Sequence, residues 1–145
     1  MANAASLQPL IDLMQERVDD ATRILGTLVS AEQDAKSKLQ LLMQYREEYV
    51  TRFRNASSNG LSLTSLRNYQ SFIDRIDQAI AQQRATVTTS EQRTAEGQDA
   101  WLQQRNKLKA IDTLYQQRQA GEQLRENKRE QKFQDEFAAR RSKPE

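Results

Sequence analysis

An apolar stripe repeats every seven residues through the first third of the chain and constrains what the chain can fold into. Twelve of its fourteen positions are apolar, and only Glu32 and Arg46 interrupt it. A repeat sustained over seven heptads keeps one seam facing a partner helix, which is typical of a coiled coil. We therefore predict a first helix over about residues 5–55. The a and d positions are, in order, Ile11, Met14, Val18, Ala21, Leu25, Leu28, Glu32, Ala35, Leu39, Leu42, Arg46, Tyr49, Phe53 and Ala56.

A second heptad repeat begins at Leu66 and predicts a second helix over about residues 63–140. Its d row turns polar from Gln83 to Gln104, and the threonines at 86, 88 and 89 together with Gly97 lower the helix propensity there. We expect the middle of this helix to be helical but pliable. The a and d positions are Leu66, Tyr69, Ile73, Ile76, Ile80, Gln83, Val87, Ser90, Thr94, Gly97, Trp101, Gln104, Leu108, Ile111 and Tyr115.

The sequence Asn-Ala-Ser-Ser-Asn-Gly at residues 55–60 separates the two repeats and is the clearest turn signal in the chain. Ser62 follows as an N-cap, with Leu61 and Leu66 placed to form a hydrophobic staple. A short connection makes two striped helices antiparallel neighbours. The prediction is an all-α fold: one antiparallel coiled-coil hairpin over residues 1–145, with its turn at residues 56–62.

Two details of this hairpin are predicted from single residues. The first helix would be capped by Ser6 or Gln8, with Pro9 in its first turn, where a missing N–H costs nothing. Glu32 and Arg46 would extend outward from the seam, since long side chains keep their charge in water, although buried polar groups can also fix register. We expect Trp101 to pack against the other helix.

Composition excludes most chemistry. The chain has no cysteine and no histidine, which excludes thiolate or imidazole metal sites and the common nucleophile systems. No phosphate-binding loop or metal-ligand spacing is present, so we expect no catalytic residue, no metal, no cofactor and no small-molecule substrate.

Charge and hydropathy narrow the partners. With 22 basic and 20 acidic residues interleaved, nothing marks a face for nucleic acid, and a basic zipper would need a parallel pair. Residues 1–13 lack the pattern of a signal peptide, and no apolar run approaches the roughly 18 residues of a membrane span. We therefore expect a cytoplasmic protein that binds other proteins.

Two regions carry apolar residues that the seam does not need. Around the turn, one line on each helix forms a shared face, made of Lys38, Leu42, Tyr45, Tyr49, Phe72, Ile76, Ala79 and Gln83. Exposed aromatic patches are typical of protein interfaces. The alternatives are a locally wide seam or self-association into a bundle.

The second region is the C-terminal end, which beyond about residue 118 has no opposing helix. Residues 116–145 hold eight basic and six acidic residues, with Leu124, Phe133 and Phe137 as the large apolar groups. Such a helix is marginal without a partner. It could be a docking peg that inserts into a partner, or a solvated tail.

Several short runs resemble the FliJ family of flagellar protein-export components. They are LMQYREEY at residues 42–49, NYQSFI at 68–73, ENK at 126–128, QK at 131–132, DEFA at 135–138 and the closing KPE at 143–145. The resemblance extends from end to end of the chain, and the order and spacing of the runs are more specific than any one of them.

The resemblance implies a stalk-like coiled coil, peripheral at the cytoplasmic side of the inner membrane, that couples a hexameric export ATPase to the export-gate membrane protein. Some such proteins also bind export chaperones. By position, the eight residues of the shared face would bind the gate. The open end of the hairpin would bind the ATPase through its N-terminal turns and residues 124–140, including Leu124, Lys128, Lys132, Phe133 and Phe137. An injectisome stalk, a general secretion chaperone and a self-assembling structural coiled coil are the alternatives.

Overall fold

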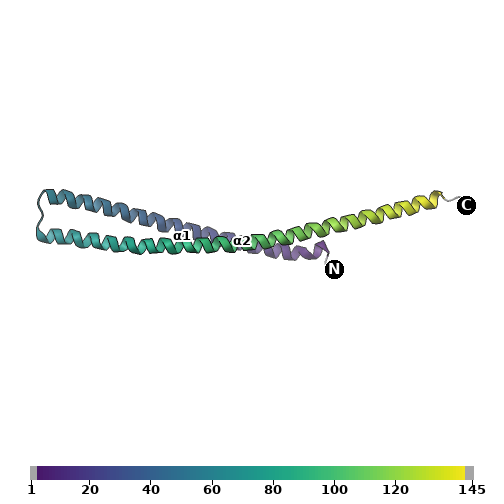
Figure 1. The fold of residues 1–145 in the computed structure, drawn as a ribbon, viewed down its shortest axis with the longest axis horizontal. Coiled ribbons are helices and arrows are strands. Elements are labelled where there is room, and N and C mark those ends of the chain that lie inside the picture. Colours follow the sequence, from purple (N-terminus) through teal and green to yellow (C-terminus); the bar gives the residue numbers. More distant parts are fainter. Residues whose placement is uncertain (1–2, 143–145) are drawn as a thin grey trace. The chain divides into compact units, whose positions relative to one another are not determined.

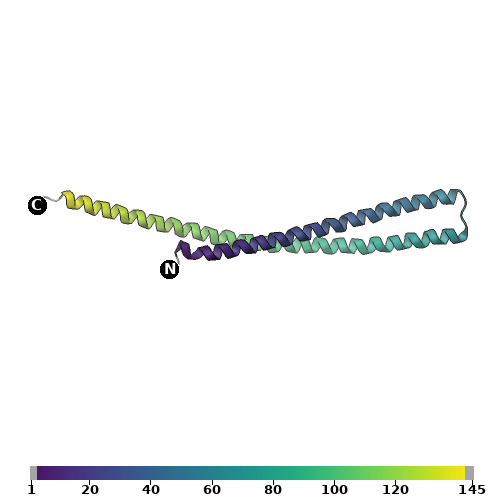
Figure 2. The ribbon, with the colours of Figure 1, turned by 180° about the vertical axis from the view of Figure 1, so that it is seen from behind.

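Within residues 3–142, which the computed structural model describes, the chain forms two long helices and no strand. Helix α1 spans Ala4–Ser58 and helix α2 spans Leu63–Ser142, and only residues 59–62 join them. The two helices pack against each other, and Figures 1 and 2 show them from opposite sides, joined by the short connection. The predicted all-α hairpin fold is therefore confirmed. The closing KPE sequence lies outside the described residues.

Contacts divide the chain into two compact units. The first combines residues up to Ala21 with those from Trp101 onward, and the second is Thr22–Ala100, which contains the turn. Both helices contribute to both units. The helix bounds differ from the expected ones by three residues or fewer, whereas the interpretation of the chain as one domain stays a prediction.

The seam follows the two heptad repeats. Every predicted a and d position on both helices is buried or half-buried, including the polar ones. The best-shielded apolar side chains of the second unit are Ala35, Ile76, Ile80 and Val87. Among the described residues no large side chain is fully shielded, because a seam between only two helices leaves each side chain one open edge.

The polar middle of α2 packs against α1 through hydrogen bonds and a glycine rather than through large apolar side chains. The buried amide of Gln83 donates a 2.9 Å hydrogen bond to the backbone carbonyl of Ala35, and the hydroxyl of Thr94 donates to the carbonyl of Leu28. A Cβ at Gly97 would lie 2.6 Å from Cδ1 of Leu28, so the glycine provides the space that this leucine fills. Polar and small residues thus bring the two backbones close where apolar residues are scarce.

The connection is built as the turn sequence predicts. Gly60 has a φ of +85°, in the left-handed region that glycine adopts without a steric penalty, just after the end of α1. The amides of Asn59 and Gly60 donate to the carbonyls of Ala56 and Ser57, which satisfies the last turn of the helix. The hydroxyl of Ser62 then accepts from the amide of Ser65 at 3.2 Å, so the predicted N-cap of α2 is confirmed.

The start of α1 differs from the prediction. Asn3 is the cap, since its side-chain oxygen accepts from the amide of Ser6 at 3.0 Å, and neither Ser6 nor Gln8 takes that role. Pro9 consequently lies in the second turn, at the sixth helical position. The first turn forms there because Ala4 and Leu7 are buried against α2 in the first unit, and this packing outweighs the hydrogen bond that Pro9 cannot make.

Substitution of Gly60 tests the turn. We expect Gly60→Ala to lower the free energy of unfolding by about 1 kcal/mol, because alanine is strained at positive φ. Gly26→Ala is the matched control: Gly26 lies inside α1 with open space around an added Cβ, so alanine should raise stability by about 1 kcal/mol. Thermal melts followed by circular dichroism measure both. Equal shifts in the same direction would contradict the turn geometry.

Candidate partner-binding surfaces

Five aromatic rings form a continuous cluster near the turn, in the second unit. Tyr49 lies at its centre, with ring centroids 4.2 Å from Phe72, 5.4 Å from Tyr69 and 6.5 Å from Tyr45. Tyr45 meets Phe72 edge-on at 6.2 Å, and Phe53 meets Tyr69 at 5.5 Å. All of these separations but the shortest lie in the range in which aromatic pairs attract beyond simple burial. The cluster therefore holds α1 and α2 together and also fixes the orientation of its outermost rings.

The cluster leaves one side open to solvent. Tyr45 is 46% exposed and Leu41, one turn before it, is 65% exposed. Lys38 is exposed, while Leu42, Tyr49, Phe72 and Ala79 are half-buried. We call this surface the aromatic face, formed by Lys38, Leu41, Leu42, Tyr45, Tyr49, Phe72 and Ala79.

Two of the eight residues predicted for the shared face are buried in the seam. Ile76 is 6% exposed and Gln83 is 8% exposed, and the amide of Gln83 is engaged with the Ala35 carbonyl. These side chains position the helices beneath the aromatic face. Phe53 and Tyr69 have the same supporting role and were absent from the predicted site, although the heptad repeats had placed both in the seam.

The other side of the seam, which we call the opposite flank, is defined by Met43, Arg46 and Asp77. The guanidinium of Arg46 reaches out of the seam and pairs with Asp77 of α2 through two hydrogen bonds, one of them 3.3 Å long. Hydrogen bonding from Arg46 is the main cause that holds the pKa of Asp77 below its ordinary value. Glu32 likewise pairs with Lys36 one turn on, at 3.2 Å. Arg46 thus extends outward, as predicted, whereas the side chain of Glu32 is only 19% exposed.

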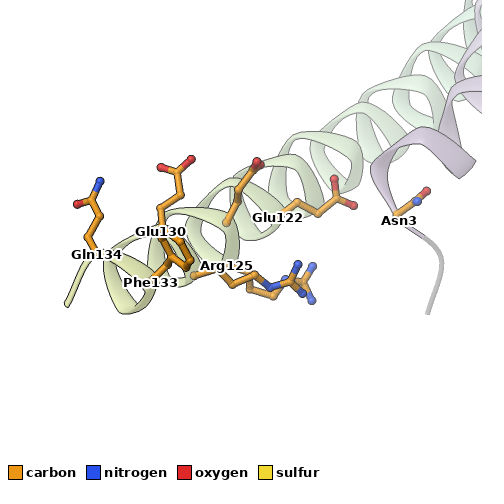
Figure 3. A pocket seen from close by; sticks show the side chains of 8 residues that line it. Asn3, Glu122, Arg125, Glu130, Phe133 and Gln134 are labelled. Atoms are coloured by element: carbon orange, nitrogen blue, oxygen red, sulfur yellow. The ribbon is translucent and has the colours of Figure 1, made fainter. Parts of the chain in front are cut away.

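In the first unit, α2 continues past the start of α1, and every side chain of residues 123–142 is exposed. We call this the unpaired segment. Pairing reaches farther than the expected limit near residue 118, because the Glu122 carboxylate accepts a 2.8 Å hydrogen bond from the backbone amide of Ala4. Figure 3 shows Glu122 directed toward the start of α1. A carboxylate at a helix N-terminus satisfies a free amide and complements the helix dipole.

The unpaired segment carries the predicted apolar groups on its surface. Phe133 is 70% exposed, and Leu124 and Phe137 are more than half exposed. Lys128 and Lys132 are exposed between them, and the guanidinium of Arg141 lies 5.0 Å from the ring centroid of Phe137. A hollow lies where α1 begins, lined by Asn3, Glu122, Arg125, Glu126, Arg129, Glu130, Phe133 and Gln134. Within the part of the chain that the structure describes, no second helix covers residues 123–142.

Trp101, also in the first unit, is half-buried as the repeat predicts. The guanidinium of Arg105, one turn on, lies 5.4 Å from the centre of its ring.

Metal chemistry and a membrane span find no support in the described part of the chain. Residues 3–142 contain no group of three or more acidic, cysteine or histidine side chains that could hold a metal ion. Neither described helix is both long and apolar enough to cross a bilayer. The features that these residues do present are two solvent-exposed apolar surfaces on a helical scaffold.

The described residues thus form an all-α, two-helix antiparallel hairpin with an aromatic face and an unpaired helical segment. Residues 3–144 match the family model described as the flagellar FliJ protein. The flagellar FliJ protein of Salmonella typhi is 35% identical over 140 residues, covering 97% of this chain and 95% of the relative. That of Escherichia coli (strain K12) is 33% identical with the same coverage.

The chain belongs to the flagellar FliJ family and is a component of flagellar protein export. The family resemblance noted in the sequence is confirmed.

Proposed function

We propose that this chain is a stalk-like coiled coil that binds the flagellar export ATPase and the export-gate membrane protein and couples one to the other. The observation that carries the proposal is that the chain exposes two apolar surfaces that its own seam does not use. One is the aromatic face, and the other is the unpaired segment. Exposed aromatic patches are typical of binding sites for other proteins.

The aromatic face is the proposed surface for the cytoplasmic domain of the gate protein. Its contact residues would be Lys38, Leu41, Leu42, Tyr45, Tyr49, Phe72 and Ala79, with Ile76 and Gln83 supporting them from the seam. Ring-to-ring packing limits the rotamers of Tyr45 before any partner arrives. A side chain that is ordered in advance loses less conformational entropy on binding.

The unpaired segment and the first turns of α1 are the proposed contacts of the ATPase ring. Leu124, Phe133 and Phe137 supply apolar area, and Lys128 and Lys132 supply charge. A lone helix with so little packing gains most of its contacts from a partner. Insertion of the open end of the hairpin into the ATPase ring would supply these missing contacts.

Coupling requires that the rod contact at least one partner differently in that partner's different states, since equal binding to every state shifts nothing. Helix α2 contributes Phe72 to one proposed surface and Phe133 to the other. The two proposed contacts are therefore joined covalently by one continuous helix. The chain would act at the cytoplasmic side of the inner membrane through these partners, and would contact export chaperones without catalysing a reaction itself.

Stimulation of the ATPase tests the proposal at the open end. We expect the full chain to raise ATP hydrolysis by a purified flagellar export ATPase. Phe133→Ser with Phe137→Ser should remove most of that increase without lowering the melting temperature, because both rings are exposed. Leu102→Ser, at an exposed leucine outside the unpaired segment, is the control and should stimulate normally. Unchanged stimulation by the double variant would exclude this contact.

Binding to the gate tests the aromatic face. We expect Tyr45→Ala to weaken binding to the purified cytoplasmic domain of the gate protein by about 2 kcal/mol, the scale of an aromatic interface residue, and to reduce motility. Met43→Ala is a matched control, since Met43 is 45% exposed but lies on the opposite flank. Calorimetry measures both affinities. Equal loss in the two variants, or no loss in either, would show that the face is not the contact.

A further inference from the structure

We propose that the aromatic face binds an acidic segment of its partner, one that carries an apolar or aromatic anchor among carboxylates. The inference rests on the proposed function for the location of the contact and goes beyond it in the chemistry of what is bound. Its basis is a charge difference between the two sides of the same stretch of coiled coil.

Nine charged residues lie within residues 38–52 of α1 and 65–82 of α2, and the seam divides them unequally. Helix periodicity places Lys38, Tyr45 and Arg52 on one line, since they are seven residues apart, and places Arg75 one turn after Phe72. The aromatic face therefore has three cations on or beside it and one carboxylate, Glu48. The rest of the same stretch holds Arg46, Glu47, Arg67, Asp74 and Asp77. The net formal charge is +2 on one side and −1 on the other.

The cations beside the aromatic face are available to a partner. Lys38, Arg52 and Arg75 are all exposed, and no ion pair in the described part of the chain engages any of them. On the opposite flank, by contrast, Arg46 is already neutralised by Asp77. Unpaired surface cations gain from an arriving carboxylate without first breaking an existing pair.

The apolar part of the bound segment would lie between these charges. Tyr45 is the exposed ring at the centre, with Lys38 two turns before it and Arg52 two turns after it. The exposed side chain of Leu41 extends the apolar area. A segment with one large apolar side chain and carboxylates on both sides complements this arrangement.

An anionic lipid surface would share this chemistry but fits the residues less well. Recognition of acidic lipids through a polybasic site typically uses about four to eight cations. The aromatic face has only three cations, and the carboxylate of Glu48 lies on the same side of the seam. The charge count therefore favours an acidic polypeptide.

Charge reversal with a matched control tests this inference. In the first triple variant Lys38, Arg52 and Arg75 become Glu; in the second Arg54, Arg67 and Arg84, which lie away from the aromatic face, become Glu. Both change the net charge equally, and circular dichroism checks that both fold. We expect the first variant to bind the cytoplasmic domain of the gate protein about tenfold more weakly at 0.1 M salt, with a flatter salt dependence. The second should stay within about twofold of the original chain.

A synthetic probe separates this inference from the proposed function. A labelled peptide with one phenylalanine flanked by glutamates should bind the original chain and not the first triple variant, whereas its lysine counterpart should not bind. Loss of gate binding in Tyr45→Ala but not in the first triple variant would overturn the acidic chemistry alone. Gate binding that is unaffected by Tyr45→Ala would overturn the proposed contact. Binding of phosphatidylserine vesicles that depends on Tyr45 at 0.15 M salt, without peptide binding, would assign the face to lipid instead.

Discussion

One narrow seam between two helices holds this chain in shape, and the other features depend on it. A two-stranded coiled coil can shield only the a and d rows, so all other side chains stay at least partly in solvent. This is why a surface such as the aromatic face can exist without being buried by the fold. It is also why the last turns of α2, which extend past Ala4 at the start of α1, are exposed to solvent. The same geometry that stabilises the hairpin leaves the aromatic face and the unpaired segment exposed.

The seam could be predicted from the sequence because its signal is local and periodic. Every a and d position from Ile11 to Tyr115 is shielded in the structure, and Ser62 caps α2 as its position before Leu63 indicates. The aromatic cluster also follows from register, since Tyr45, Tyr49 and Phe72 occupy neighbouring rows of the two repeats. Periodicity determines which side of a helix a residue occupies, and the position of the turn determines which residues of the two helices lie opposite each other.

What the sequence did not reveal depends on contacts between distant residues. Asn3 caps α1 and Ala4 meets Glu122 because packing of the first turn outweighs the preference of Pro9 for a helix start. The polar stretch of α2 was predicted to be helical but pliable, and it is helical. The sequence did not reveal that Gln83 and Thr94 donate to backbone carbonyls of α1 or that Gly97 makes room for Leu28. Heptad counting scores such positions as poor, because it cannot represent a hydrogen bond across the helices.

The proposed stalk function would need both a stable pair of helices and exposed contact surfaces, and the aromatic cluster contributes to both. Rings that brace the two helices also form the proposed gate contact, so binding and stability are linked at Tyr49 and Phe72. Tyr45 is more exposed than these two rings, at 46%. A partner that binds there meets a surface whose backbone is already fixed by the seam.

The distance between the two helices, measured in solution, tests the central claim most directly. The chain has no cysteine, so Ser37→Cys and Ala85→Cys give two unique sites for spin labels on the outer sides of α1 and α2. In a sample diluted with unlabelled chain, pulsed dipolar spectroscopy should give roughly 20–35 Å, the separation of labels across two packed helices. A continuous helix through residues 59–62 would place the labels about 70 Å apart, at about 1.5 Å per residue. That longer distance would contradict the hairpin and every surface derived from it.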